Sequence, residues 1–125
     1  MAERVLVFDV ETTGLPLRRN RPYTETGNFP EVVQLAHRTG AEPVCNVYLT
    51  TQGSIPAEAV GVHGVTDEFL AVHGVEPKGA FEAFLALVAE SDVLVAHNFE
   101  FDSSVILAQA HGLYVLPCTG YPSRL

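Results

Sequence analysis

The chain has 125 residues, of which 47% are hydrophobic, and fifteen acidic against seven basic residues give it a formal net charge of −8. This composition predicts one packed domain over residues 1–125 and argues against a protein that coats duplex nucleic acid. No apolar run approaches the roughly 20 residues of a membrane span, so no membrane contact is expected. Cys45 and Cys118 lie far apart without metal-type spacing, which is typical of reduced thiols in a cytoplasmic protein.

The first half of the chain predicts three strands. Val5 to Val10 is a β-branched and aromatic run ended by Thr-Thr-Gly, and its length suits a strand buried on both faces. Val32 to Arg38 and Val44 to Thr50 predict two further strands, joined by a turn at Ala41 to Pro43 in an antiparallel meander. The loop from Pro16 to Pro30 is long for a compact domain, so it is either functional or mobile.

The second half predicts two helices and two short strands. Ser54 to Pro77 shows no clear periodicity and is expected to be irregular. Apolar residues spaced i, i+3, i+4, i+7 predict an amphipathic helix from about Gly79 to Glu90. A buried strand at Val93 to Ala96 leads to a second helix, with Asn98 as N-cap and Gly112 as terminator. A last strand is predicted over residues 114–118, and the whole order indicates an α/β fold around a mixed sheet.

Three carboxylates lie at the ends of these elements. Asp9 and Glu11, in FDVETTGL, end the first strand, and Asp102, in AHNFEFD, opens the second helix. Because side chains alternate along a strand, Asp9 and Glu11 point the same way, with Cα atoms about 6.6 Å apart. Mg²⁺ prefers one or two carboxylates plus waters and substrate phosphate oxygens, and two such ions can promote phosphodiester hydrolysis. The pattern predicts metal-assisted phosphate chemistry.

Each of these residues also has a plain structural interpretation. Asp9 and Glu11 can form a polar strand end that opens into a turn, and Asp102 can be a first-turn acid favoured by the helix dipole. His63 lies beside a glycine and is interpreted as an ordinary loop residue. The arginines of the long loop can form a solvated surface (Arg18, Arg19 and Arg21). No Ser-His-Asp order, Cys-based site, phosphate-binding glycine loop or nicotinamide fingerprint occurs.

The two acidic motifs together resemble those of the DEDD, or DnaQ-like, family of 3′→5′ exonucleases. The segments FPEVVQLAHRTG (29–40), IPAEAVGVHGVTDEFL (55–70) and PCTG (117–120) resemble further parts of that family in the same order. The resemblance implies a ribonuclease H-like fold, with a mixed β-sheet flanked by helices.

The resemblance also implies roles for individual residues. Asp9, Glu11 and Asp102 match the catalytic acids that hold two Mg²⁺ or Mn²⁺ ions. The implied substrate is a single-stranded nucleic-acid 3′ end, with DNA favoured over RNA, and the implied partner is a DNA polymerase. Five further residues match positions at or near the 3′ nucleotide, namely Thr12, Gly14, Leu15, His63 and Phe101.

One part of the family pattern has no counterpart. The third motif is a histidine or tyrosine followed a few residues later by aspartate, yet no Asp or Glu follows Asp102, and His111 falls too early. The missing aspartate would complete the metal site, and its helix would cover part of the sheet. We therefore expect a domain that is truncated at its C-terminal end and lacks the C-terminal helix. We also expect it to expose an apolar face that a second copy or another partner covers.

Two other functions stay open. The absent fourth acid favours a catalytically inactive nuclease-fold module that binds a nucleic-acid end or a polymerase. A phosphatase of the haloacid dehalogenase type also has a strand ending in Asp-x-Asp. Glu11 in place of the second aspartate, and the lack of a suitable downstream lysine, argue against it. The residues do not distinguish among proofreading, repair and RNA maturation.

Overall fold

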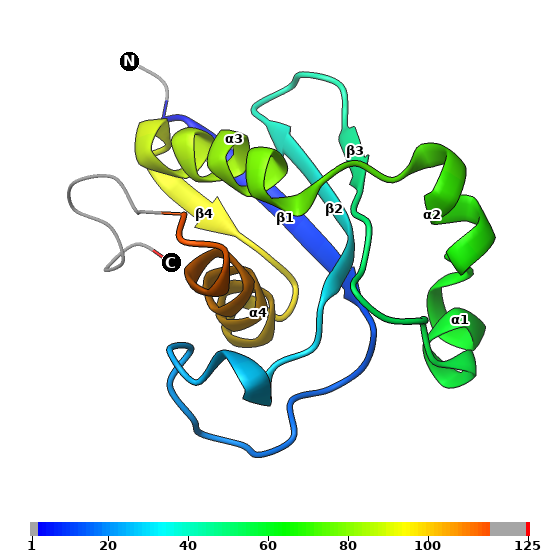
Figure 1. The fold of residues 1–125 in the computed structure, drawn as a ribbon. Helices are drawn as coiled ribbons and strands as arrows, with labels where there is room; N and C mark the ends of the chain where they lie inside the picture. Colours follow the sequence, from blue (N-terminus) through cyan, green and yellow to red (C-terminus); the bar gives the residue numbers. More distant parts are fainter. Residues whose placement is uncertain (1–2, 116–124) are drawn as a thin grey trace.

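The computed structural model describes residues 3–115 and Leu125 and contains a four-stranded mixed sheet with helices packed against it (Figure 1). The strand order is β3-β2-β1-β4, in which β1 pairs antiparallel with β2 and parallel with β4, and β2 pairs antiparallel with β3. The strands are β1 (Val5–Thr12), β2 (Val32–Thr39), β3 (Cys45–Tyr48) and β4 (Val93–Val95). The helices are η1 (Thr26–Asn28, 3₁₀), α1 (Ala57–His63), α2 (Asp67–His73), α3 (Pro77–Glu90) and α4 (Phe99–Gly112).

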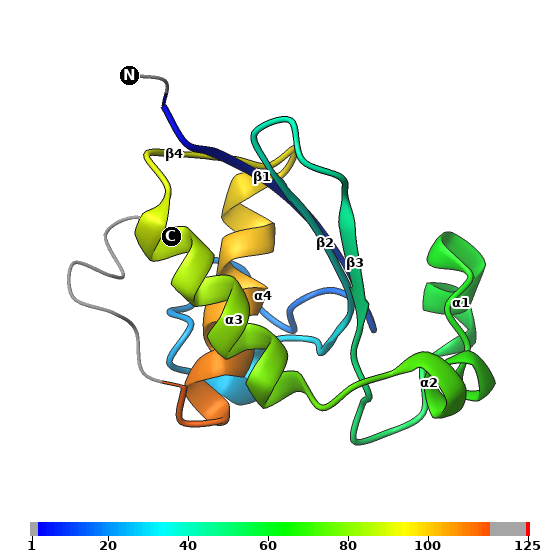
Figure 2. The same cartoon turned by 90° about the horizontal axis from the view of Figure 1, so that it is seen from above.

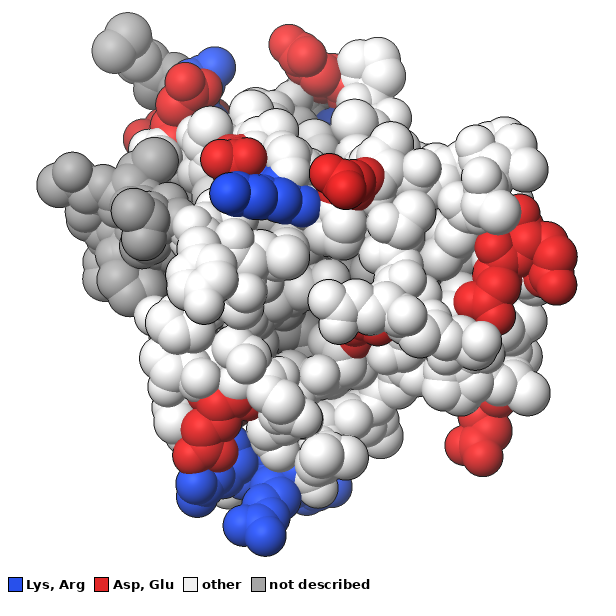
Figure 3. All heavy atoms as spheres, in the orientation of Figure 1, with Lys and Arg blue, Asp and Glu red and all other residues white. Residues whose placement is uncertain are grey.

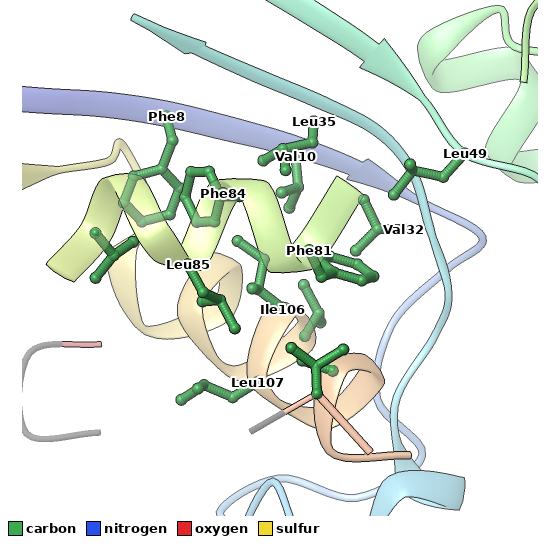
Figure 4. Packing of buried hydrophobic residues seen from close by; sticks show 14 of the residues in the cluster. Phe8, Val10, Val32, Leu35, Leu49, Phe81, Phe84, Leu85, Ile106 and Leu107 are labelled. Atoms are coloured by element: carbon green, nitrogen blue, oxygen red, sulfur yellow. The ribbon is translucent and has the colours of Figure 1, made fainter. Parts of the chain in front are cut away.

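The core lies between one face of the sheet and the helices α3 and α4, which both pack on that face (Figure 2). The apolar stripe predicted for α3 is buried, and Phe84 meets Phe8 of β1 edge to face, with 5.3 Å between ring centroids (Figure 4). The helix begins at Pro77, two residues before the predicted start, because proline suits the first helical turn, where its missing N–H would have no partner.

The strand β1 is buried on one face only, so the prediction of burial on both faces is wrong. Leu6, Phe8 and Val10 point into the core, whereas Val7 is 38% exposed. The outward positions Val5 and Val7 are also apolar, which hides the alternation of the strand in the sequence.

The strand β4 was predicted to be buried, and this is also wrong. Val93 and Val95 are 36% and 43% exposed. The parallel pairing places Val95 next to Val7, on the sheet face that α3 and α4 leave open. We call these three residues, Val7, Val93 and Val95, the valine strip. Three partly exposed valines therefore lie together on this face of the sheet.

The segment predicted to be irregular contains the helices α1 and α2, of seven residues each. Such short helices carry too few residues to show a clear apolar period. The α1 helix ends at His63 and is capped by Gly64, whose φ of 74° lies in the left-handed region that glycine adopts without cost. Thr66 caps the start of α2, because its side chain accepts a hydrogen bond from the Phe69 N–H at 3.0 Å. Both helices pack beyond β3 around a small second cluster that includes Val33 (Figure 1).

The α4 helix begins as predicted but ends one residue later than predicted. Asn98 takes the N-cap position, but its side chain makes no capping hydrogen bond. Gly112 is the last helical residue, and the left-handed residue beyond it is Tyr114, with a φ of 59°. Tyr114 and Val115 are not in a strand, and the rest of the last predicted strand lies outside the described residues, as does PCTG (117–120). Among the helices described, none is long and apolar enough to cross a membrane.

Candidate active site

The three carboxylates lie close together where β1 extends past the end of β4. The parallel pairing of β4 with β1 ends at Val95, opposite Val7. Asp9 and Glu11 lie further along β1, with side chains on the face opposite the buried core residues. The chain then turns from β4 into α4, whose first turn carries Asp102. The end of one strand and the start of one helix therefore place three acids in one region.

Asp102 is the buried member of this group. It is 3% exposed, and its Oδ2 atom has no hydrogen-bond partner. Burial raises the pKa of Asp102 from 3.8 to about 6. The negative charges of Asp9 and Glu11 and a hydrogen bond with the Asp9 side chain add to this rise, and His97 opposes it. Asp9 is exposed and Glu11 is half-buried. The structure thus places a buried carboxylate beside two others.

The three carboxylates are suitable ligands for a hard divalent cation, but they do not form a complete coordination shell. In the part of the chain that the structure describes, no group of three or more His, Cys, Asp or Glu side chains is arranged to hold a metal ion. Mg²⁺, however, takes one or two carboxylates and fills its other positions with waters and substrate oxygens. A buried, unpartnered carboxylate oxygen beside two acids is a setting in which a bound cation would relieve both repulsion and desolvation. Oxygen-only donors favour Mg²⁺ or Mn²⁺.

His63 connects α1 to the end of β1, so the interpretation as an ordinary loop residue is wrong. The Val65 N–H donates to His63 Nδ1 at 3.0 Å, which leaves the proton of the neutral ring on Nε2. That Nε2–H lies 3.0 Å from the carbonyl oxygen of Thr12 and donates to it. Both ring nitrogens are therefore engaged with backbone. His63 positions the turn after β1.

The turn itself is closed by Thr12. Its hydroxyl donates to the Gly14 carbonyl at 2.6 Å, and the Gly14 N–H lies 3.2 Å from the same Oγ1 atom. A side chain at Gly14 would meet no atom within 4 Å, so the space beside this backbone is open. The Thr-Thr-Gly sequence thus forms a compact turn with one accessible side.

A cavity of about 660 Å³ lies over this turn, between β1, α1 and α4. Glu11 reaches it, whereas Asp9 and Asp102 do not line it. All five residues predicted to contact substrate do line it, namely Thr12, Gly14, Leu15, His63 and Phe101. The structure therefore brings together residues from three separate segments of the chain.

A second cavity, of about 480 Å³, adjoins the first and was missed by the sequence analysis. Leu15 and Phe101 line both cavities, so they stand between them. Its other walls come from the loop after β1, from Phe29 and from the first turns of α4. The signal that could have found it is the length of that loop and its three arginines.

Comparisons with known proteins agree with this geometry. The model of the family described as RNase_T, Exonuclease, matches residues 6–119. The DNA polymerase III subunit epsilon of Rickettsia typhi is 32% identical over 103 residues, and that of Rickettsia prowazekii is 28% identical. Each match covers 79% of this chain and 41% of the relative, so the chain spans about two fifths of the length of these proteins.

Solved structures of exonuclease I share the fold. The product-bound form has a TM-score of 0.68 and 16% identity, over 88% of this chain and 26% of the other. The Escherichia coli enzyme in complex with a dT13 oligonucleotide has a TM-score of 0.65 and 16% identity, over 87% and 24%. At such identity the likeness shows the fold alone, and it confirms the ribonuclease H-like arrangement. The chain belongs to the RNase_T exonuclease family, and this confirms the family that its two acidic motifs predicted.

Proposed function

We propose that the chain is a 3′→5′ exonuclease domain that hydrolyses phosphodiester bonds at the 3′ end of a single strand, with DNA as the substrate. The observation that carries the proposal is the buried, unpartnered oxygen of Asp102 beside Asp9 and Glu11. Burying a carboxylate next to two others costs stability. A cation bound by these acids would offset that cost, and it would also bind a substrate phosphate.

In this proposal Asp9, Glu11 and Asp102 hold Mg²⁺ or Mn²⁺. When bound, the ions supply water activation and stabilisation of the leaving oxygen. Hydrolysis forms a bond between a water oxygen and phosphorus and breaks the bond from phosphorus to the 3′ oxygen of the preceding nucleotide. A nucleoside 5′-monophosphate is released. The contribution of the chain is to place the acids and to orient the strand end.

The terminal nucleotide would occupy the cavity of about 660 Å³ beside Glu11. The open side of Gly14 lets a sugar or phosphate approach the backbone closely. Leu15 is 79% exposed and Phe101 is half-buried, so both have apolar surface available for contact with a base. His63 acts as a positioning residue, since both of its ring nitrogens bind backbone.

The comparisons support the choice of substrate and partner. The Escherichia coli exonuclease I structure holds a dT13 oligonucleotide, and the Rickettsia relatives are subunits of a DNA polymerase. We propose single-stranded DNA and a DNA polymerase for this chain on that basis. We place the activity in the cytoplasm, where Cys45, a free and exposed thiol, would stay reduced.

The test is a time course with a 5′-labelled single strand and Mg²⁺ or Mn²⁺, beside the Asp9→Ala variant. The expected result is a ladder that shortens by one nucleotide at a time from the 3′ end and is absent in the variant. Equal degradation by both proteins would show that the activity is a contaminant. An intact strand with both would refute the exonuclease proposal for this chain.

A second candidate is a module that binds a nucleic-acid end without cutting it. It is favoured by the lack, among the described residues, of three His, Cys, Asp or Glu side chains arranged to hold a metal ion. This candidate predicts that a labelled strand binds with equal affinity with and without Mg²⁺ and stays intact. Metal-dependent release of mononucleotides that is lost in Asp102→Ala would exclude it.

A further inference from the structure

The cavity beside the candidate active site carries an unusual charge for this chain. It is lined by Arg18, Arg19 and Arg21, three of the seven basic residues in a protein of net charge −8. In Figure 3 they form the blue area at the lower edge, over the loop between β1 and β2. Cations concentrated on an acidic protein mark a place where an anion is attracted.

Two of these arginines are free to bind a ligand. Arg21 is paired with Glu25, with 2.8 Å between Arg21 Nε and Glu25 Oε2. Arg18 and Arg19 form no ion pair within the described part of the chain. Glu100 lines the same cavity and offsets part of their charge. The remaining balance is positive, because two unpaired cations face one carboxylate.

The loop is held in place at Arg18. The Oδ1 atom of Asn28 accepts a hydrogen bond from the Arg18 N–H at 2.7 Å, and its Nδ2 donates to the Arg18 carbonyl at 3.0 Å. The Leu17 N–H donates to the Asn28 carbonyl at 2.8 Å. Asn28 is buried. Its side-chain amide therefore holds the backbone of Arg18 in place while the Arg18 guanidinium stays free.

The two cavities meet at Leu15 and Phe101. We propose that Arg18 and Arg19 bind the phosphate backbone of the nucleic-acid strand on the 5′ side of the nucleotide being removed. This inference deepens the proposed function and rests on it for the identity of the ligand. Guanidinium groups suit this role because they stay charged and bind phosphate oxygens in pairs.

The test is equilibrium binding of a 5′-fluorescein dT oligonucleotide in EDTA, measured by anisotropy between 50 and 300 mM salt. The Arg18→Gln/Arg19→Gln variant removes the two free charges. The matched control, Arg38→Gln/Lys78→Gln, removes the same charge from β2 and α3. Single-stranded nucleic acid contributes a salt slope of about 0.7 per phosphate contact, so the slope should fall by about 1.4 in the first variant.

The corresponding loss of affinity is about tenfold or more at 50 mM salt. The control should change affinity by less than about threefold and leave the salt slope unchanged, because long-range charge effects are screened. Glu100→Gln should act in the opposite direction and tighten binding. These three results together would support the inference.

The outcomes separate this inference from the exonuclease proposal. If the wild-type chain cuts DNA but the arginine variant binds as the control does, the inference is overturned and the exonuclease proposal stands. If the wild-type chain does not cut yet binds through the arginines, the exonuclease proposal fails and the phosphate site stands. A wild-type chain that does not bind the oligonucleotide overturns the inference.

Discussion

The buried carboxylate of Asp102 should make the metal-free protein less stable than a variant without that charge. We expect Asp102→Asn to raise thermal stability at neutral pH. Asparagine has nearly the same shape as aspartate and carries no charge, so it removes both the desolvation of a buried carboxylate and its repulsion with Asp9 and Glu11. The same change should abolish any metal-dependent activity, because it removes one of the proposed ligands.

The size of the effect follows from the pKa of Asp102. A rise from 3.8 to about 6 is worth about 3 kcal/mol, at about 1.4 kcal/mol per unit. Because Asp102 is almost fully buried, solvent screens little of this cost. This free energy is an upper limit, so we expect a gain of about 1–3 kcal/mol. For a domain of this size, that corresponds to a rise in Tm of about 4–12 °C.

The gain should depend on pH in a defined direction. The folded pKa lies above the unfolded one, so between pH 3.8 and about 6 the folded chain keeps a proton that the unfolded chain has lost. Wild-type stability therefore falls as the pH rises through this window, and the penalty is complete above about pH 6. The two proteins should melt at similar temperatures near pH 4 and separate at pH 7.5.

The assay is thermal melting followed by circular dichroism in EDTA, at pH 4, 5, 6 and 7.5, with and without added Mg²⁺ or Mn²⁺. The cation should raise the Tm of the wild type at pH 7.5 and leave Asp102→Asn nearly unchanged. Glu90→Gln is a control, because Glu90 is exposed on α3. An Asp102→Asn variant that melts at or below the wild-type temperature at pH 7.5 in EDTA would refute the reasoning.

Three further predictions test other parts of the structure. Replacing His63 with alanine removes the hydrogen bond to the Thr12 carbonyl. It should cost about 1 kcal/mol in stability and raise the KM for a single strand more than it lowers kcat; an unchanged KM would argue against the positioning role. Thr66→Ala removes the α2 cap and should lower the free energy of unfolding in urea by about 1 kcal/mol, whereas Thr66→Ser should lose much less. The valine strip is expected to be covered by a second copy of the chain. Sedimentation should then show a dimer that Val95→Lys converts to a monomer, and a monomer at all concentrations would exclude that arrangement.

The sequence predicted best the helix whose apolar residues all lie along one buried face. The α3 helix showed its full stripe because only one of its faces is buried. The α1 and α2 helices were missed because their contacts with the second cluster are made by one or two residues each. Local periodicity could not reveal them. Tertiary packing and the caps at Gly64 and Thr66 define them instead.

The acids of the candidate site could be predicted from the sequence. The burial of these acids and the contacts around them could not. Asp9 and Glu11 follow from strand alternation, and Asp102 follows from its place in the first turn of a helix. That Asp102 would be the buried one could not be read from the motif, because burial depends on where β4 stops relative to β1. The role of Asn28 was equally hidden, since it lies ten residues from Arg18 in a segment without periodicity.

An irregularity in the sheet explains how the turn after β1 becomes the floor of a cavity. Between Glu11 and Thr12 the register with β2 shifts, so that Thr12 pairs with Val32 and Val33 is left over. In a regular strand Val33 would lie on the same face as Leu35, in the main core, and Val32 on the opposite face. Here Val32 enters the core under α3 and α4, and Val33 enters the second cluster under α1 and α2. This bulge gives α1 its packing surface, and α1 in turn brings His63 to the Thr12 carbonyl. In the sequence, two adjacent valines predict only a strand. The bulge that shapes the cavity could not be predicted, because it depends on the packing of helices on both faces of the sheet.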